Sequence, residues 1–272
     1  MTTEAVISVD GFVVESAGHR AEVRYEPFDS GLLDLAIGRA FVPDHLGRPT
    51  LRQLLLELAE RAGDAGFDQL LRRVDASSFD DIWALESTGY LLMDVGVTFG
   101  RRFASPYEPK VVPHVRVRPA VPEDVELLLE TMLDVPWGSR YEADPAYDRA
   151  AVRDLQARWL RNSLAGRADH VLIGHVDGQP AGYVTCRFVE EHGERIGEID
   201  LVGTVPAFRG RGVAAAVVDH SLAWFSERVA LVTVRTQATN TIAAGVYERA
   251  GMTLRHSDMT FRLALTERGG KP

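Results

Sequence analysis

The sequence contains little cysteine and little lysine. Cys186 is the only cysteine among 272 residues, so no disulfide can form within the chain, which suits a reducing cytoplasm. We interpret Cys186 itself as a small buried hydrophobic residue on a strand. Lys110 and Lys271 are the only lysines against many arginines and alanines, which suggests a GC-rich bacterial genome and says nothing about mechanism.

The chain also lacks a surplus of positive charge and any long hydrophobic run. Its formal charge of −9 argues against nucleic acid or an anionic membrane as a partner. Nowhere do about 18 apolar residues run together, as a membrane span requires, and Met1 to Asp10 lacks the basic and apolar regions of a signal peptide. We therefore expect a soluble, unsecreted, cytoplasmic protein. The sequence leaves open whether it forms a homodimer.

Length and composition describe an ordinary globular chain. Hydrophobic residues make up 46% and charged residues 25%, and the length allows one large or two small domains. A proline-punctuated stretch over 105–113 has the composition of a linker. We expect a smaller N-terminal domain at 1–104, this linker, a main domain at 114–265 and a tail at 266–272.

The main domain alternates strand and helix patterns, which predicts an α/β (α+β) fold. Acidic residues after Pro122 favour a helix start there, and Asp177-Gly178 predicts a hairpin turn. The expected order is a strand at 115–117, helices at 122–133 and 148–164, strands at 170–176, 181–189 and 196–205, a helix to 228, a strand at 230–235, a helix at 241–250 and a final hairpin to 265.

A stretch rich in glycine and arginine follows the strand at 196–205 and opens the next helix. Gly210 and Gly212 let the backbone pass close to an anion, and the N–H groups at the helix start point at it. Arg209 and Arg211 add fixed positive charge to an acidic chain. The stretch therefore predicts a pyrophosphate cradle, formed by Arg209, Gly210, Arg211, Gly212, Val213 and Ala214.

The loop is also compatible with other nucleotide-binding patterns. Gly210, Gly212 and Ala215 fit a loose dinucleotide fingerprint, but the loop comes late in the chain and the acidic residue at about the right distance, Glu227, precedes the next strand. A Walker P-loop is excluded because no Lys-Ser/Thr follows. A glycine-rich turn that merely starts a helix stays open.

The loop resembles the acetyl-CoA signature of the Gcn5-related N-acetyltransferases (GNAT), Arg/Gln-x-x-Gly-x-Gly/Ala, which Arg209, Gly212 and Ala214 match. The expected order of elements also resembles the GNAT fold. The resemblance implies a central mixed, mostly antiparallel sheet flanked by helices, acetyl-CoA as the coenzyme and acetyl transfer to an amine. It also implies that backbone groups of Leu201, Val202 and Thr204 pair with the pantetheine arm where two strands splay apart.

A second signature lies between 236 and 252. Asn240 ends a strand and opens a helix, Tyr247 lies two turns further along the same face, and Gly251 ends the helix. By resemblance, Asn240 binds the coenzyme arm and Tyr247 is the general acid for the departing thiolate, a role that the phenol pKa of about 10 suits. Each residue alone could instead be structural, Asn240 as a helix cap and Tyr247 as a core aromatic.

The amine acceptor must lose a proton, so a general base is expected. Glu198, Asp200, Val202 and Thr204 share one face of the predicted strand by its period of two. Glu198 or Asp200 could act as the base, directly or through water, and either could equally be a solvated residue at a strand edge.

The two halves of the chain resemble each other at an offset of 162 residues, the distance from Gly89 to Gly251. At this offset Arg73 matches Arg235 and Glu86 matches Glu248, although chance similarity between two strand-helix-strand segments stays open. A duplication would make the N-terminal domain a degenerate GNAT-like half. Pro49, which lacks an N–H, would then lie under the cradle, and we expect this half not to bind coenzyme A.

The whole layout is similar to the TDP-fucosamine acetyltransferases, which acetylate the 4-amino group of a TDP-4-amino-4,6-dideoxyhexose. The similarity rests on segments such as Leu85–Tyr90, Ser139–Pro145 and Trp159–Ser163. It departs at Phe261-Arg262, where those enzymes have an aromatic-His pair, so the sugar is left open. The resemblance implies a nucleotide-sugar acceptor near the early helices of the main domain, with four substrate-binding candidates: Arg140, Tyr141, Arg158 and Arg161.

Two rival functions remain from the sequence. One is a GNAT enzyme that acts on another small-molecule or protein amine, and the other is a non-catalytic acyl-CoA-binding module. The histidines show no metal-binding spacing with cysteine or carboxylates, so we predict no metal site.

Overall fold

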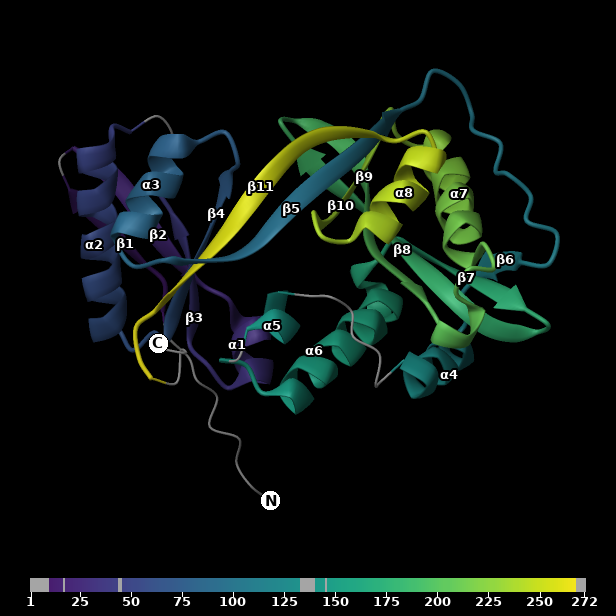
Figure 1. The fold of residues 1–272 in the computed structure, drawn as a ribbon, viewed down its shortest axis with the longest axis horizontal. Coiled ribbons are helices and arrows are strands. Elements are labelled where there is room, and N and C mark those ends of the chain that lie inside the picture. Colours follow the sequence, from purple (N-terminus) through teal and green to yellow (C-terminus); the bar gives the residue numbers. More distant parts are fainter. Residues whose placement is uncertain (1–9, 17, 44–45, 133–139, 145, 268–272) are drawn as a thin grey trace. The chain divides into compact units, whose positions relative to one another are not determined.

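The computed structural model of the chain describes residues 10–16, 18–43, 46–132, 140–144 and 146–267. The chain divides into two compact units: unit 1 comprises Met1–Gly96, Gly138–Leu155 and Ser257–Pro272, and unit 2 comprises Val97–Trp137 and Gln156–His256. This division by contacts differs from the linear boundaries expected at 104 and 114. The long strands β5 (Leu91–Arg102) and β11 (Thr253–Ala264) each contribute residues to both units (Figure 1).

Unit 1 is a sheet with helices packed on it. Its strands follow the order β1-β2-β3-β4-β11, in which only β3 and β4 pair in parallel. Leucines at helical spacing in α2 pack with Leu70 and Val74 of β4 in one hydrophobic cluster. The elements are β1 (Phe12–Ser16), β2 (His19–Tyr25), α1 (Pro27–Leu33), β3 (Ile37–Phe41), α2 (Arg48–Asp64), β4 (Gln69–Asp75), α3 (Phe79–Ser87) and α5 (Arg140–Ala143).

The strands of unit 2 have a hydrophobic cluster on each face. The order β5-β10-β9-β8-β7-β6 contains a parallel pair, β9 with β10, followed by antiparallel pairs. Helices α7 and α8 pack in one cluster and α4 and α6 in the other. The elements are β6 (Arg116–Pro119), α4 (Pro122–Met132), α6 (Arg149–Asn162, shared with unit 1), β7 (His170–Val176), β8 (Gln179–Glu191), β9 (Glu194–Thr204), α7 (Val213–Ser226), β10 (Leu231–Gln237) and α8 (Thr241–Arg249).

The internal repeat is visible in the element boundaries. Elements β4, α3 and β5 begin and end 162 residues before β10, α8 and β11, respectively. Helix α2 also ends 162 residues before α7 ends. The two shorter helices end alike. Gly89 and Gly251 both have positive φ, and Tyr90 and Met252 each donate their N–H to a carbonyl five residues earlier. The duplication hypothesis is thereby supported by local geometry as well as by sequence.

Two expectations about elements need correction. The final hairpin is wrong, because residues 253–264 form the single strand β11, whose second half pairs with β4 from Asp258 to Ala264. The stretch at 105–113 is not a free linker. It belongs to unit 2 and is hydrogen-bonded along α7, through Tyr107 to Ser226 and Asp219. Its proline content is typical of an irregular backbone. The hydrogen bonds of Tyr107 join residues more than 100 positions apart, and such contacts leave no pattern in the local sequence.

Candidate active site

The loop predicted as a cradle is an irregular turn that ends at the start of α7. A short 3-10 turn, Pro206–Phe208, leads into Arg209. Gly210 and Gly212 then take φ values of 75° and 76°, which side chains of L-residues rarely adopt. Gly212 is the N-cap of α7, and the first intrahelical bond runs from the Ala216 N–H to the Gly212 carbonyl.

This helix start leaves donors without intrahelical partners. The first four N–H groups of a helix, here those of Gly212, Val213, Ala214 and Ala215, have no carbonyl one turn earlier to bind. Arg209 and Arg211 are exposed beside them. Arg211 makes a long ion pair of 3.4 Å with the exposed Asp177, and its guanidinium lies 5.6 Å from the centre of the Phe208 ring. The loop therefore combines free donors, a helix N-terminus and two guanidinium groups, which suits a diphosphate.

Strands β9 and β10 separate next to this loop. They pair in parallel at Gly197–Val232, Glu198–Thr233 and Ile199–Val234. Within the described residues no pair joins them beyond these three, although β9 continues to Thr204 and β10 to Gln237. On its other side β9 stays paired with β8 up to Thr204. The β10-facing edge of β9 beyond Ile199 is therefore available to an extended ligand, whereas the Leu201 N–H donates to the Thr185 hydroxyl of β8 at 3.0 Å.

A β-bulge at Asp200 changes which side chains share a face of β9. The register with β8 places Leu201 opposite Thr185 and Ile199 opposite Cys186, so Asp200 is the extra residue. Ile199 and Val202 consequently pack in the same cluster beneath α7, whereas Leu201 packs in the cluster on the other face. The expectation that Asp200 and Val202 share a face was wrong, because a simple period of two does not pass through a bulge.

Both candidate bases lie in ion pairs. Asp200 meets Arg167 at 2.8 Å and Arg187 at 3.9 Å, and Glu198 meets Arg187 at 3.5 Å. The Asp200 side chain is 16% exposed and that of Glu198 is 34% exposed. Sequence reasoning missed the two arginines, because β-sheet register and the turn after α6 bring them to β9. The role of either carboxylate as base stays a prediction.

Tyr247 lies on the buried side of α8, with 4% of its surface exposed. Its ring is 5.9 Å from that of Phe99, centroid to centroid. Burial raises the pKa of the Tyr247 hydroxyl above its usual value near 10, so the group keeps its proton at neutral pH. In the described part of the chain no hydrogen-bond partner meets this hydroxyl. The geometry is compatible with a general acid, and that role stays a prediction.

Asn240 is the N-cap of α8, and its Oδ1 accepts the Ala243 N–H at 3.1 Å. This bond fixes the side chain at the C-terminal end of β10, seven residues before Tyr247. The amide nitrogen is not used by the cap. The structural and the ligand-binding interpretations of Asn240 are therefore compatible with each other.

The four substrate-binding candidates fall in different surroundings. In unit 1, Arg140 bonds the Tyr141 hydroxyl at 2.5 Å, and that buried hydroxyl donates to Asp29. In unit 2, Arg161 forms a two-bond ion pair with Glu126 at 3.0 and 3.1 Å, whereas Arg158 is exposed. These contacts use the side chains of three candidates within the protein. Their role in acceptor binding stays a prediction.

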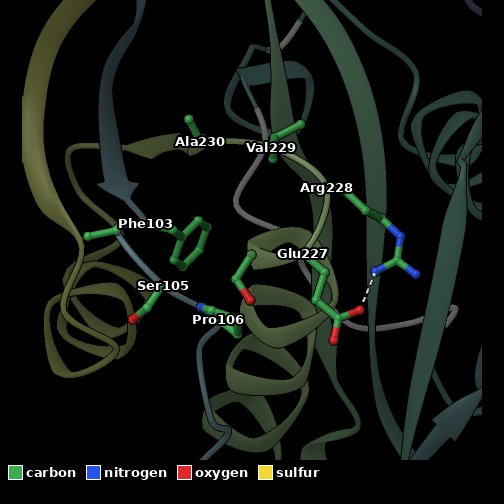
Figure 2. Close-up of a pocket in the computed structure, with 9 residues that line it drawn as sticks. Phe103, Ser105, Pro106, Glu227, Arg228, Val229 and Ala230 are labelled. Atoms are coloured by element: carbon green, nitrogen blue, oxygen red, sulfur yellow. Dashed lines mark hydrogen bonds and ion pairs between the residues drawn. The ribbon is translucent and has the colours of Figure 1, made fainter.

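A hollow of about 400 Å³ lies at the other end of α7. Figure 2 shows Phe103, Ser105 and Pro106 on one side of it and Glu227, Arg228, Val229 and Ala230 on the other. These residues flank the C-terminus of α7, whereas the cradle lies at its N-terminus. The hollow is therefore not the predicted coenzyme site.

A family model described as the acetyltransferase (GNAT) family matches residues 129–252. The chain also aligns with the solved GCN5-related N-acetyltransferase of Sphaerobacter thermophilus at a TM-score of 0.66 and 20% identity, over 95% of this chain and 82% of that one. The chain has the GNAT fold. The predicted fold class is confirmed, and the GNAT superfamily is supported.

Other GNAT likenesses cover both units. A tandem GNAT protein from the clavulanic acid biosynthesis pathway aligns at a TM-score of 0.63 and 13% identity, over 97% of this chain and 85% of that one. A mycothiol acetyltransferase of Cellulomonas flavigena is 28% identical over 90% of this chain and 72% of its own length. Together with the family model, the mycothiol acetyltransferase bears out the expectation of an acyltransferase.

The spore coat polysaccharide biosynthesis protein SpsD of Bacillus subtilis is 30% identical over 149 residues, which are 54% of this chain and 50% of that protein. An uncharacterized N-acetyltransferase of Archaeoglobus fulgidus is matched over 58% of its length. The chain thus spans between one half and three fifths of the length of these two relatives.

Among the described residues no group of three or more His, Cys, Asp or Glu side chains is arranged to hold a metal ion. No helix within those residues is long and apolar enough to cross a membrane.

Proposed function

We propose that this chain is an acetyl-CoA-dependent N-acetyltransferase that moves an acetyl group to a primary amine. The observation that carries the proposal is the combination within unit 2 of a cationic helix N-terminus, an unpaired edge of β9 and a buried, protonated tyrosine. A glycine-rich turn alone would explain the first feature. It would not explain why the strand edge and the phenol accompany it.

Two groups of residues in this chain fit two parts of the coenzyme, the diphosphate and the pantetheine arm. The N–H groups of Gly212, Val213 and Ala214, with Arg209 and Arg211, would hold the diphosphate. The edge of Leu201, Val202 and Thr204 and the Asn240 amide would hold the pantetheine arm. Gly212 supports this assignment, because a Cβ there would lie 3.3 Å from Val112 and the positive φ disfavours any side chain. When bound, the coenzyme supplies an acetyl group activated as a thioester.

Within this proposal Tyr247 supplies a proton to the leaving thiolate, because burial keeps its hydroxyl protonated. Glu198 or Asp200 accepts the proton of the amine, directly or through water. The Glu198 side chain is 34% exposed and that of Asp200 is 16% exposed. The greater exposure of Glu198 favours it, because water or the amine can reach it more easily.

For the acceptor we propose the amine of a nucleotide-activated (TDP) aminodeoxy sugar. The likeness to a protein named for spore coat polysaccharide biosynthesis supports a sugar. Arg140, Tyr141, Arg158 and Arg161 are the candidates to bind the acceptor, and the exposed Arg158 is the one available without breaking a contact within the protein. Arginine suits a diphosphate because it binds it in a planar, two-bond geometry.

The test is to mix purified protein with acetyl-CoA and TDP-4-amino-4,6-dideoxygalactose, and to follow thiol release and the mass of the sugar nucleotide. We expect one thiol per acetylated sugar and a mass increase of one acetyl group. If acetyl-CoA raises the melting temperature but no thiol appears, the sugar is excluded and the coenzyme assignment stands. If acetyl-CoA has neither effect, the proposed function is wrong.

A different amine acceptor is the second candidate, favoured by the mycothiol acetyltransferase that aligns with 90% of this chain. The acceptor panel should therefore include the acceptor substrate of that enzyme. A non-catalytic acyl-CoA-binding module is the alternative of another class. Turnover in the wild-type chain that Tyr247→Phe loses, with coenzyme binding retained, would exclude it.

A further inference from the structure

The segment Phe103–Val115, called the strap here, contacts the C-terminal half of α7 and the loop at its N-terminus in unit 2. At the C-terminal end of α7, the Phe103 N–H donates to Ala230, and the Tyr107 N–H donates to the Ser226 hydroxyl at 2.9 Å. The Tyr107 hydroxyl then donates at 2.7 Å to Asp219, a buried carboxylate in the middle of the helix. These bonds fix the path of the strap towards the N-terminus of α7.

The strap ends against the cradle. His114 Nε2 lies 2.7 Å from the Arg211 carbonyl oxygen, and a Cβ on Gly212 would lie 3.3 Å from Val112. The strap is itself held in a tight turn here, because the Val115 N–H donates to the Val112 carbonyl at 2.9 Å with Pro113 at the second position of the turn. His114 is therefore presented to the cradle by a turn of restricted conformation.

The contact to Arg211 determines the direction of a donor that the coenzyme site needs. A peptide bond is planar and trans, so the Arg211 carbonyl and the Gly212 N–H point in opposite directions. Glycine at 212 would tolerate either orientation of this peptide, because it has no Cβ. A hydrogen-bond donor on the strap that binds the Arg211 carbonyl keeps this carbonyl pointing towards the strap. The Gly212 N–H then points away from the strap, as one of the free donors at the start of α7.

We propose that His114 is a positioning residue of the coenzyme site, which donates its Nε2 proton to the Arg211 carbonyl and so fixes the orientation of the Arg211–Gly212 peptide. This inference rests on the proposed coenzyme site. It assigns a function to a segment that composition alone describes as a linker. It also explains why Val112 packs against Gly212, since this contact lets the strap stabilise the conformation of the cradle loop.

The test is calorimetric titration of the full chain with coenzyme A and with its 3′-dephospho form. We expect His114→Ala to weaken the binding of both by the same factor, about threefold to tenfold, which corresponds to one net hydrogen bond. His114→Gln should restore binding to within about twofold, because its amide nitrogen reaches the position of Nε2. His114→Asn is the matched control, since its shorter amide reaches only the position of Nδ1 and should not restore binding.

Several results would overturn the proposal, and coenzyme binding by the wild-type chain distinguishes them from a failure of the proposed function. If the wild-type chain binds no coenzyme A, the coenzyme site itself is wrong. If wild type binds and His114→Ala binds equally well, His114 positions nothing. Weakening for coenzyme A but not for the 3′-dephospho form would indicate direct contact with the 3′-phosphate instead. Equal binding by the Gln and Asn variants would contradict the assignment to Nε2.

Two further readouts separate positioning from general destabilisation. In steady-state assays with an acceptor that supports turnover, His114→Ala should raise KM for acetyl-CoA by the same factor and leave kcat and the acceptor KM within about twofold. In ¹⁵N spectra of the free protein, the Gly212 amide should shift in the Ala and Asn variants and return in the Gln variant. A fall in melting temperature without these changes would assign His114 a merely structural role.

Discussion

The two repeats of this chain share a scaffold but differ in the features that bind and activate a thioester. The helix α7 begins at Gly212 with φ of 76° and four free N–H groups. Its counterpart α2 begins at Gly47 with φ of −66°, and Pro49 in its first turn has no N–H. An element can thus keep its end point while its first turn loses the donors that an anion needs.

The shorter helices show the same contrast. Asn240 and Ser78 occupy equivalent N-cap positions with nearly the same backbone angles, yet only Asn240 bonds the helix through its side chain. Tyr247 of α8 corresponds to Leu85 of α3, and both side chains are buried in their own hydrophobic clusters. Packing in the cluster therefore explains why an apolar side chain occupies this position of the helix, but it does not explain the hydroxyl group of Tyr247.

The largest expected effect is on Tyr247. Tyr247→Phe should lower kcat by at least about 100-fold, the usual contribution of a general acid, and leave coenzyme affinity unchanged. The matched control is Tyr90→Phe, which removes an equally buried hydroxyl from unit 1 and should leave kcat unchanged. Steady-state kinetics and calorimetry of both variants measure this. Equal losses in the two variants would assign Tyr247 to packing.

The next effect concerns the two glycine N-caps. Gly212→Ala places a side chain at positive φ and against Val112, and the strain of about 1–2 kcal/mol or more should weaken coenzyme binding at least tenfold. Gly47→Ala lies at negative φ, with the nearest atom, on Pro49, 4.0 Å from the new Cβ. It should leave coenzyme binding unchanged. Comparable coenzyme affinities in the two variants would remove the distinction between the repeats.

A smaller effect is expected from the caps of α8 and α3. Asn240→Ala removes the bond to Ala243 and should lower the free energy of unfolding by about 1 kcal/mol. Ser78→Ala should change it by no more than about 0.5 kcal/mol, since its side chain makes no cap bond. Urea unfolding measures both. If the Ser78 variant loses as much as the Asn240 variant, the caps are equivalent.

The smallest expected effect concerns the pH dependence of kcat. Burial raises the pKa of Tyr247, and a general acid works in its protonated form, so the alkaline limb of kcat moves to higher pH. We expect kcat to show no decline from about pH 7 to pH 9.5, with the fold monitored by circular dichroism. A decline of kcat near pH 8 in a folded protein would contradict the assignment of a buried phenol as the acid.

Local sequence patterns predicted a substantial part of this molecule. The glycine spacing indicated the loop at Arg209–Ala214, and Asn240 was recognised as a helix start because N-capping is a local interaction. The offset between Gly89 and Gly251 indicated a repeat whose boundaries recur in the fold. In each case a few residues close together in the chain determine the feature.

What could not be predicted depends on contacts between distant residues. The bulge at Asp200 follows from the register of β9 against β8, and its ion pair with Arg167 spans 33 residues. The contact of His114 with Arg211 spans 97 residues, and that of Tyr141 with Asp29 spans 112. Composition correctly marked the strap as irregular, but it carried no information about the helix to which the strap is bound.

The most direct test of the account is the stoichiometry of coenzyme A binding to the full chain, measured by calorimetric titration. One coenzyme A per chain is predicted, lost or strongly weakened in Gly212→Ala and unchanged in Gly47→Ala. Two molecules per chain would show that the first repeat also binds the coenzyme. No binding at all, or binding that depends on Gly47 and not on Gly212, would contradict the assignment of the site to unit 2.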